Sequence, residues 1–139
     1  MAADLLQGRC YLPSERLAGL GLKPEDLLQP ASEPRLHPLY QAYLDRADAH
    51  LLAGWAYTTA LPRRSVRVRL ACSWPILIGR ATLKLLRSGN ALDAAQRIKV
   101  SRREVKRLML RSVLLYPWPG AWEKMVPAGK AVALPANLP

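Results

Sequence analysis

The spacing of apolar residues predicts three long helices along the chain. Between Pro34 and Pro62, apolar side chains recur every three or four residues, as from Leu36 to Tyr40 and Tyr43, with charged residues between them. This period places the apolar side chains on one face of an α-helix. We therefore expect a long amphipathic helix that begins near Pro34 and ends before Pro62.

Two more helices are expected downstream. The segment Ser65–Ser88 is apolar all round in its middle, which indicates burial between other helices, although Pro75 removes one backbone hydrogen bond there. The third helix starts with a capping box, in which the hydroxyl of Ser101 accepts a hydrogen bond from the amide of Glu104. Pro117 ends this helix. Its apolar stripe consists of Val105, Leu108, Met109 and Val113.

Proline and glycine interrupt the rest of the chain. The region 11–34 accommodates only short helical turns, with Ser14–Leu17 and Pro24–Leu28 as the candidates. Residues 118–139 are rich in Pro, Ala and Gly, and we expect an irregular tail there. No useful stretch alternates apolar and polar residues, so we expect an all-α fold with one helical domain, residues 1–117, before the tail.

Length and composition are those of a single folded domain. The chain has 139 residues, of which 50% are apolar, enough for a core and too many for bulk disorder. Cys10 and Cys72 form no metal-binding or disulfide pattern, so we expect free thiols. The sequence has no signal-peptide pattern, and its uncharged stretches are shorter than the roughly 20 residues of a bilayer span. We expect a cytoplasmic protein that makes at most a peripheral contact with a membrane.

Net charge is the strongest compositional signal. The formal charge is +11 at pH 7 and the isoelectric point is about 10.4. Such a charge indicates anionic partners, which leaves three classes open: nucleic acid, anionic lipid and diphosphate substrates.

Two basic clusters follow from the helix positions. The cluster at the start of the third helix has three interpretations. It is a solvated basic face, it contacts a nucleic-acid backbone, or it binds phosphate through Lys99, Arg102 and Arg103. The aromatic residues gather elsewhere, which disfavours single-stranded nucleic acid as the partner. A second patch surrounds the start of the second helix, where cations oppose the helix dipole, so an anionic group is expected to compensate it. This patch consists of Arg63, Arg64, Arg67 and Arg69.

The candidate chemistry lies in the first dozen residues. Asp4 precedes the run Gly8-Arg9-Cys10-Tyr11-Leu12-Pro13. A helix-borne carboxylate suits Mg²⁺, which prefers oxygen ligands and bridges to phosphate oxygens. An arginine shortly downstream can clamp a diphosphate through two parallel hydrogen bonds. Tyr11 is either an ordinary packed aromatic or part of a pocket wall.

This run resembles the segment that closes the second aspartate-rich motif of squalene and phytoene synthases, the head-to-head prenyl transferases. Three later stretches, Leu51–Pro62, Arg69–Leu86 and Ile98–Met109, are similar to successive helices of that family. The resemblance covers roughly Asp4–Pro117.

The resemblance implies a part of the all-α isoprenoid-synthase helical bundle. It implies condensation of two farnesyl diphosphates in isoprenoid biosynthesis, with Mg²⁺ and, for squalene, NADPH. Asp4 would be a metal ligand, Arg9 would act catalytically at the diphosphate, and Tyr11 would line the cavity. By the same resemblance Lys99, Arg102 and Arg103 would bind the diphosphate or the NADPH phosphate.

The departures from the family pattern shape the functional expectation. The first aspartate-rich motif is absent, and so is the first half of the second motif. We therefore expect a C-terminal fragment of a squalene synthase-like enzyme that is inactive alone and is complemented by an N-terminal fragment. The alternatives are a phytoene or dehydrosqualene synthase fragment and, from another class, a non-catalytic basic helical module that binds nucleic acid or an anionic membrane.

Overall fold

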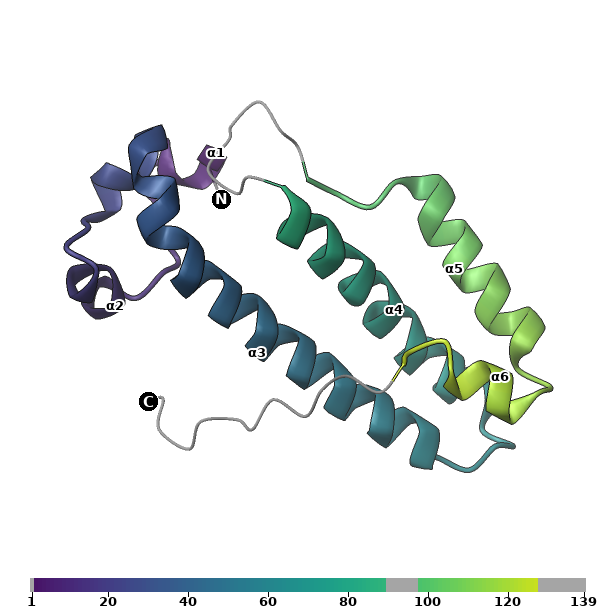
Figure 1. Ribbon diagram of the computed structural model, residues 1–139. Helices are drawn as coiled ribbons and strands as arrows, with labels where there is room; N and C mark the ends of the chain where they lie inside the picture. The colour runs from purple at the N-terminus through teal and green to yellow at the C-terminus, as the bar shows by residue number, and fades with distance from the viewer. Residues whose placement is uncertain (1, 90–97, 128–139) are drawn as a thin grey trace. The chain divides into compact units, whose positions relative to one another are not determined.

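The computed structural model describes residues 2–89 and 98–127, and these residues contain helices and no strand (Figure 1). The all-α fold class expected from the sequence is therefore confirmed. In chain order the elements are α1 (Ala2–Leu5), α2 (Ser14–Gly19), η1 (Pro24–Leu28), η2 (Pro30–Ser32), α3 (Glu33–Ala60), α4 (Val66–Ser88), α5 (Arg102–Leu115) and α6 (Pro119–Glu123).

The three long helices lie where the hydrophobic pattern placed them. Helix α3 ends just before Pro62, and α4 contains Pro75 in its interior. Helix α5 begins after Ser101, whose hydroxyl accepts a hydrogen bond from the Glu104 amide at 3.1 Å, as the capping box predicted. The two short turns are also present, as α2 and η1.

The region expected to be irregular contains a further helix. Pro119–Glu123 forms α6, with Pro119 at a position that suits the first turn of a helix. Trp122 is only 1% exposed, and its burial explains why a Pro- and Gly-rich segment becomes ordered. The remainder of the expected tail, 128–139, lies outside the described residues.

The chain divides into two compact units, which we describe separately. Unit 1 comprises Met1–Leu44 and Leu86–Ile98, and unit 2 comprises Asp45–Leu85 and Lys99–Pro139. The core of unit 1 is a cluster of leucines: Leu5, Leu17, Leu22, Leu27 and Leu36. The core of unit 2 combines aromatic and aliphatic residues: Trp55, Ile76, Leu77, Trp122 and Val126.

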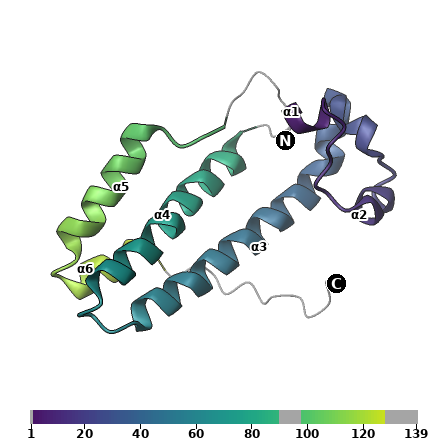
Figure 2. The same cartoon turned by 180° about the vertical axis from the view of Figure 1, so that it is seen from behind.

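In unit 2, α4 and α5 lie side by side in opposite directions in both views (Figures 1 and 2). Trp74 of α4 donates its indole N–H to the hydroxyl of Ser112 of α5. Ser112 is fully buried, whereas Val113, which the sequence pattern assigned to the apolar stripe, is 46% exposed. The pattern was wrong at this position because the hydroxyl finds hydrogen-bond partners in the interface and can therefore be buried.

Small residues bring α3 and α4 together within unit 2. A Cβ added at Gly54 would lie 3.4 Å from a methyl carbon of Ile76, and one added at Gly79 would lie 3.1 Å from a methyl carbon of Leu51. An ion pair between Arg80 Nε and Asp48 Oδ1 at 2.8 Å joins the same two helices. These contacts fix the helix pair against which α5 and α6 pack.

Candidate functional site

The turn after α1 determines where Arg9 is placed. Gly8 has a φ of +72°, a left-handed conformation that favours glycine. The Gly8 amide donates to the Leu5 carbonyl at 2.9 Å, and the Arg9 amide donates to the Asp4 carbonyl at 2.8 Å. Both bonds together form a Schellman motif that ends the helix. The Gly-Arg pair of the sequence motif is thus a helix C-cap, which sets Arg9 directly beyond the turn that carries Asp4.

The three N-terminal candidates differ in exposure. The side chain of Asp4 is half-buried on α1, whereas Arg9 is exposed. Tyr11 is 72% exposed, so within unit 1 its ring covers no core. An exposed guanidinium remains available to an anion from solvent, and this is the chemistry expected of a diphosphate clamp. Exposure does not test what the three side chains do, so their roles stay predictions.

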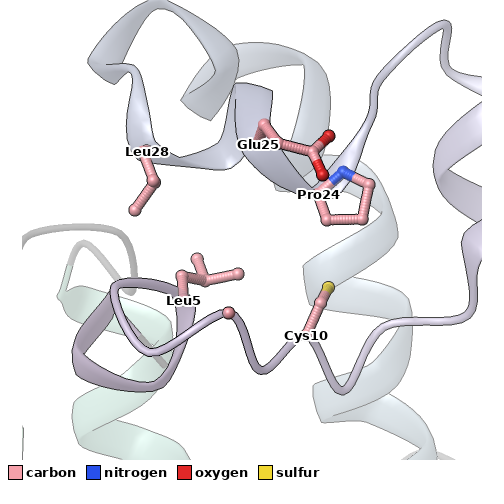
Figure 3. A pocket seen from close by; sticks show the side chains of 6 residues that line it. Leu5, Cys10, Pro24, Glu25 and Leu28 are labelled. Atoms are coloured by element: carbon pink, nitrogen blue, oxygen red, sulfur yellow. The ribbon is translucent and has the colours of Figure 1, made fainter.

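A small pocket lies beside the Gly8 turn, between α1 and η1 (Figure 3). Its volume is about 90 Å³. Typical ligand pockets are larger, at roughly 300 to 1,000 Å³, so this hollow does not hold a prenyl diphosphate. Its lining is Leu5, Gly8, Cys10, Pro24, Glu25 and Leu28.

The lining of this pocket differs from the residues that the sequence singled out for chemistry. Asp4, Arg9 and Tyr11 are not part of it, although Gly8 and Cys10 belong to the same motif. Cys10 is a free thiol, half-buried, whose sulfur lies 3.7 Å from the Leu12 carbonyl oxygen. Glu25 enters the lining from η1, and no local sequence signal could have shown that η1 would pack there.

The described residues do not make a metal site by themselves. Within 2–89 and 98–127, no three His, Cys, Asp or Glu side chains come together in a way that could hold an ion. Mg²⁺ in such proteins is held by one or two carboxylates together with substrate phosphates and water. Asp4 supplies one carboxylate, the minimum of that range, so the described residues would hold Mg²⁺ weakly and only together with substrate phosphates.

The second group of candidates lies at the start of α5, in unit 2. Lys99, Arg102 and Arg103 are all exposed. The Ser101 hydroxyl satisfies the amide of Glu104, while the amides of Arg102 and Arg103 stand at the open end of the helix. The positive end of the helix dipole and three cations therefore coincide, which favours binding of an anion such as phosphate.

The structure therefore places the predicted site residues in two groups. Asp4, Arg9 and Tyr11 belong to unit 1, and Lys99, Arg102 and Arg103 belong to unit 2. Each group is compact because its members are neighbours in sequence.

Sequence reasoning missed one arrangement altogether. Arg69 was expected in an exposed patch, but it is 3% exposed and packs on aromatic rings. The only signal for this was its place between apolar neighbours, Val68 and Leu70, in an otherwise basic stretch.

Comparison with known proteins gives one family. A family model described as squalene/phytoene synthase matches residues 1–104, which is most of the chain and includes both groups of candidate residues. Comparison with curated proteins and with solved structures finds no significant match.

Proposed function

The chain belongs to the squalene/phytoene synthase family, and on that premise we propose that it forms the C-terminal, diphosphate-binding part of a squalene synthase-like prenyl transferase in isoprenoid biosynthesis. The observation that carries the proposal is the Gly8 turn. It sets an exposed arginine directly after the helix that bears Asp4, inside the segment that the family model covers. The turn thereby keeps the carboxylate-bearing helix and the arginine next to each other along the backbone, which supports a role for both at one diphosphate.

The proposed reaction condenses two farnesyl diphosphates head to head and releases diphosphate. Negative charge builds up on the departing diphosphate as its bond to carbon breaks, and fixed cations nearby stabilise that charge. In this proposal Arg9 supplies such a cation by hydrogen bonding the diphosphate oxygens. Tyr11 lines the cavity near the reacting carbon atoms.

Mg²⁺ and NADPH are the cofactors that we propose. A bound Mg²⁺ would supply charge neutralisation at the diphosphate. Asp4 would contribute one carboxylate to its site, and the other ligands would be substrate phosphates, water and carboxylates from outside the described residues. Lys99, Arg102 and Arg103 would hold the diphosphate or the phosphate of NADPH, which provides the reducing equivalent for squalene.

The chain by itself is expected to be inactive, because one carboxylate does not hold Mg²⁺ well enough. The test is incubation of the purified chain with farnesyl diphosphate, Mg²⁺ and NADPH, followed by extraction and chromatography of the products. We expect no squalene. Addition of an N-terminal fragment that carries the missing carboxylates should restore turnover. Turnover by the isolated chain would overturn the fragment proposal.

Diphosphate binding is tested separately from turnover. Calorimetric titration with inorganic pyrophosphate and Mg²⁺ should show binding that Arg9→Gln weakens by about tenfold, the loss of one charge-assisted interaction. The matched control is Arg16→Gln, which removes an exposed arginine from the same unit and should change the affinity little. Equal effects of both substitutions would mean that pyrophosphate binds the overall positive charge.

The product decides between squalene and phytoene or dehydrosqualene. The stretch Cys72–Leu83 resembles squalene synthases more closely, so we propose squalene. An assay of the complemented enzyme with and without NADPH separates these outcomes, because only squalene formation consumes the reductant.

The exposed face of α5 favours a second function, contact with an anionic membrane surface. Its first half presents Arg103, Lys106 and Arg107, and its second half presents Leu110 and Leu114, which are 61% and 60% exposed. Such a mixture of cations and apolar side chains suits a helix that lies in a lipid interface. None of the helices in the described residues is long and apolar enough to cross the bilayer.

Vesicle sedimentation tests this second function. The chain should sediment with vesicles that contain anionic lipid and remain in solution with neutral ones, and salt should weaken the binding. Leu110→Asp should reduce binding more than Leu28→Asp, because both leucines are exposed but only Leu110 lies on α5. Salt-sensitive binding to duplex DNA or RNA, with none to vesicles, would favour the nucleic-acid alternative instead.

A further inference from the structure

The loop between α3 and α4, together with the first turn of α4, concentrates positive charge. The first turn of α4 contains no acidic residue. Four arginines lie within seven residues here: Arg63, Arg64, Arg67 and Arg69. Within the part of the chain that the structure describes, none of the four pairs with a carboxylate; Arg63 instead donates to the Pro117 carbonyl at 3.4 Å. The N-terminus of a 23-residue helix adds its own positive potential at the same place.

One of these arginines is buried. Arg69 is 3% exposed, and its guanidinium carbon lies 4.7 Å from the centre of the Trp122 ring and 5.6 Å from that of Tyr116. Both rings contribute cation–π attraction to the guanidinium, and they adjoin each other in an edge contact with 5.5 Å between their centres. The Nε–H of Arg69 is buried without a hydrogen-bond partner, so this charged donor is left unsatisfied within the folded chain.

A second buried donor belongs to the same cluster. The indole N–H of Trp122 is also buried and without a partner, although its ring stacks on Trp55 with 4.7 Å between centres. The Tyr116 hydroxyl donates to the Arg63 carbonyl at 2.6 Å and so ties the arginine-rich loop to the end of α5. Two side chains in contact, Arg69 and Trp122, therefore each carry a buried donor without a partner, and one of these donors is charged.

From this arrangement we infer a binding site for a phosphate-type oxyanion at the N-terminal end of α4, with Arg69 as its principal ligand. A guanidinium is always charged, and its Nε–H and Nη–H donors form a fork that matches two oxygens of such an anion. A bound oxygen would satisfy the Nε–H, and the exposed Arg64 and Arg67 would raise the local concentration of anions.

Burial of the unsatisfied donors restricts the ligand to a small anion. The unsatisfied groups are buried, so a surface polyanion such as nucleic acid would reach only the exposed arginines. The site uses none of the residues to which the prenyl-transfer proposal assigns a role. The inferred anion site therefore goes beyond the prenyl-transfer proposal and does not depend on it.

The experiment is a titration of the full chain with sodium phosphate at constant ionic strength, followed by NMR of the arginine Nε–H and tryptophan indole N–H signals. We expect saturable shifts of the Arg69 and Trp122 signals and a rise of a few degrees in Tm, because a ligand that binds only the folded state stabilises it. Absence of a saturable shift at both signals would overturn the inference. A parallel titration with acetate that gives tighter binding would overturn the assignment to a phosphate-type ion.

Two variants identify the ligand residue. Arg69→Lys keeps a cation against the rings but lacks the fork, and we expect about tenfold weaker phosphate binding. Arg64→Gln removes an exposed cation from the same loop and should change the affinity by less than about threefold. A larger loss in Arg64→Gln than in Arg69→Lys would show that phosphate binds the surface patch and would contradict the buried site. Circular dichroism confirms that each variant folds before it is titrated.

Discussion

The indole N–H of Trp74 donates to the hydroxyl oxygen of Ser112 across the α4–α5 interface, with 3.0 Å between nitrogen and oxygen. Ser112 in turn donates to the Met109 carbonyl at 2.7 Å and is fully buried. The Ser112 hydroxyl thus accepts from α4 and donates within its own helix α5, so it is fully satisfied, and the bond from Trp74 joins the two helices.

Ser112→Ala should lower the free energy of unfolding by about 1–3 kcal/mol, because the Trp74 N–H is left without an acceptor. Urea denaturation measures the change. A double-mutant cycle with Trp74→Phe isolates the pair, and the two substitutions should be non-additive by at least about 0.5 kcal/mol. Additive effects would mean that the hydrogen bond contributes nothing to the interface.

Gly8→Ala should destabilise the chain by about 1–2 kcal/mol, the cost of a left-handed conformation for a residue with a Cβ. Its φ is +72° and no atom lies within 4 Å of the added carbon, so the cost is conformational and not steric. Gly19→Ala is the matched control. It also has open space but no positive φ, and it lies in α2, so it should be neutral or stabilising by up to about 1 kcal/mol. Similar melting temperatures for the two variants would contradict the role of the turn.

Trp122→Ala should remove about 3–5 kcal/mol of stability, as expected for loss of a fully buried aromatic ring. Trp122 is 1% exposed, stacks on Trp55 and makes an edge contact with Tyr116 at 5.5 Å. Trp118→Ala, at a ring that is 63% exposed, should cost less than about 0.5 kcal/mol. Equal losses in chemical denaturation would show that α6 is not part of the core.

Tyr40 should make stability depend on pH in the alkaline range. Burial raises the pKa of its hydroxyl above the ordinary value of 10.0. The unfolded chain therefore loses this proton at a lower pH than the folded chain, and stability falls as pH rises above about 10. In Tyr40→Phe this part of the decline should be absent, whereas Tyr57→Phe, at a ring that is 66% exposed, should retain it. Denaturation midpoints between pH 9 and 11, roughly the range in which tyrosine titrates, provide the measurement.

Local sequence patterns predicted much of the secondary structure. The three-to-four-residue period predicted α3 and α5, because the helix period is a property of the backbone, and a long segment that is apolar on all sides predicted α4. The cap at Ser101 was predicted from neighbours three residues apart for the same reason. The N-terminal motif indicated the family that the family model shows, because the residues of the motif are contiguous in sequence.

Tertiary structure decided which side chains those helices bury. The period could not show that Ser112 would be buried and Val113 exposed, because the burial of a hydroxyl depends on an acceptor or donor that another helix supplies.

The same reason separates Arg69 from its neighbours. By sequence it is one of four arginines in a basic stretch, and only the rings of Tyr116 and Trp122, about fifty residues later, turn it into a buried cation with an unsatisfied donor. By itself, the sequence determined the three long helices and the family. Packing between residues remote in sequence determined the buried charge, because its energy depends on contacts that no local pattern contains.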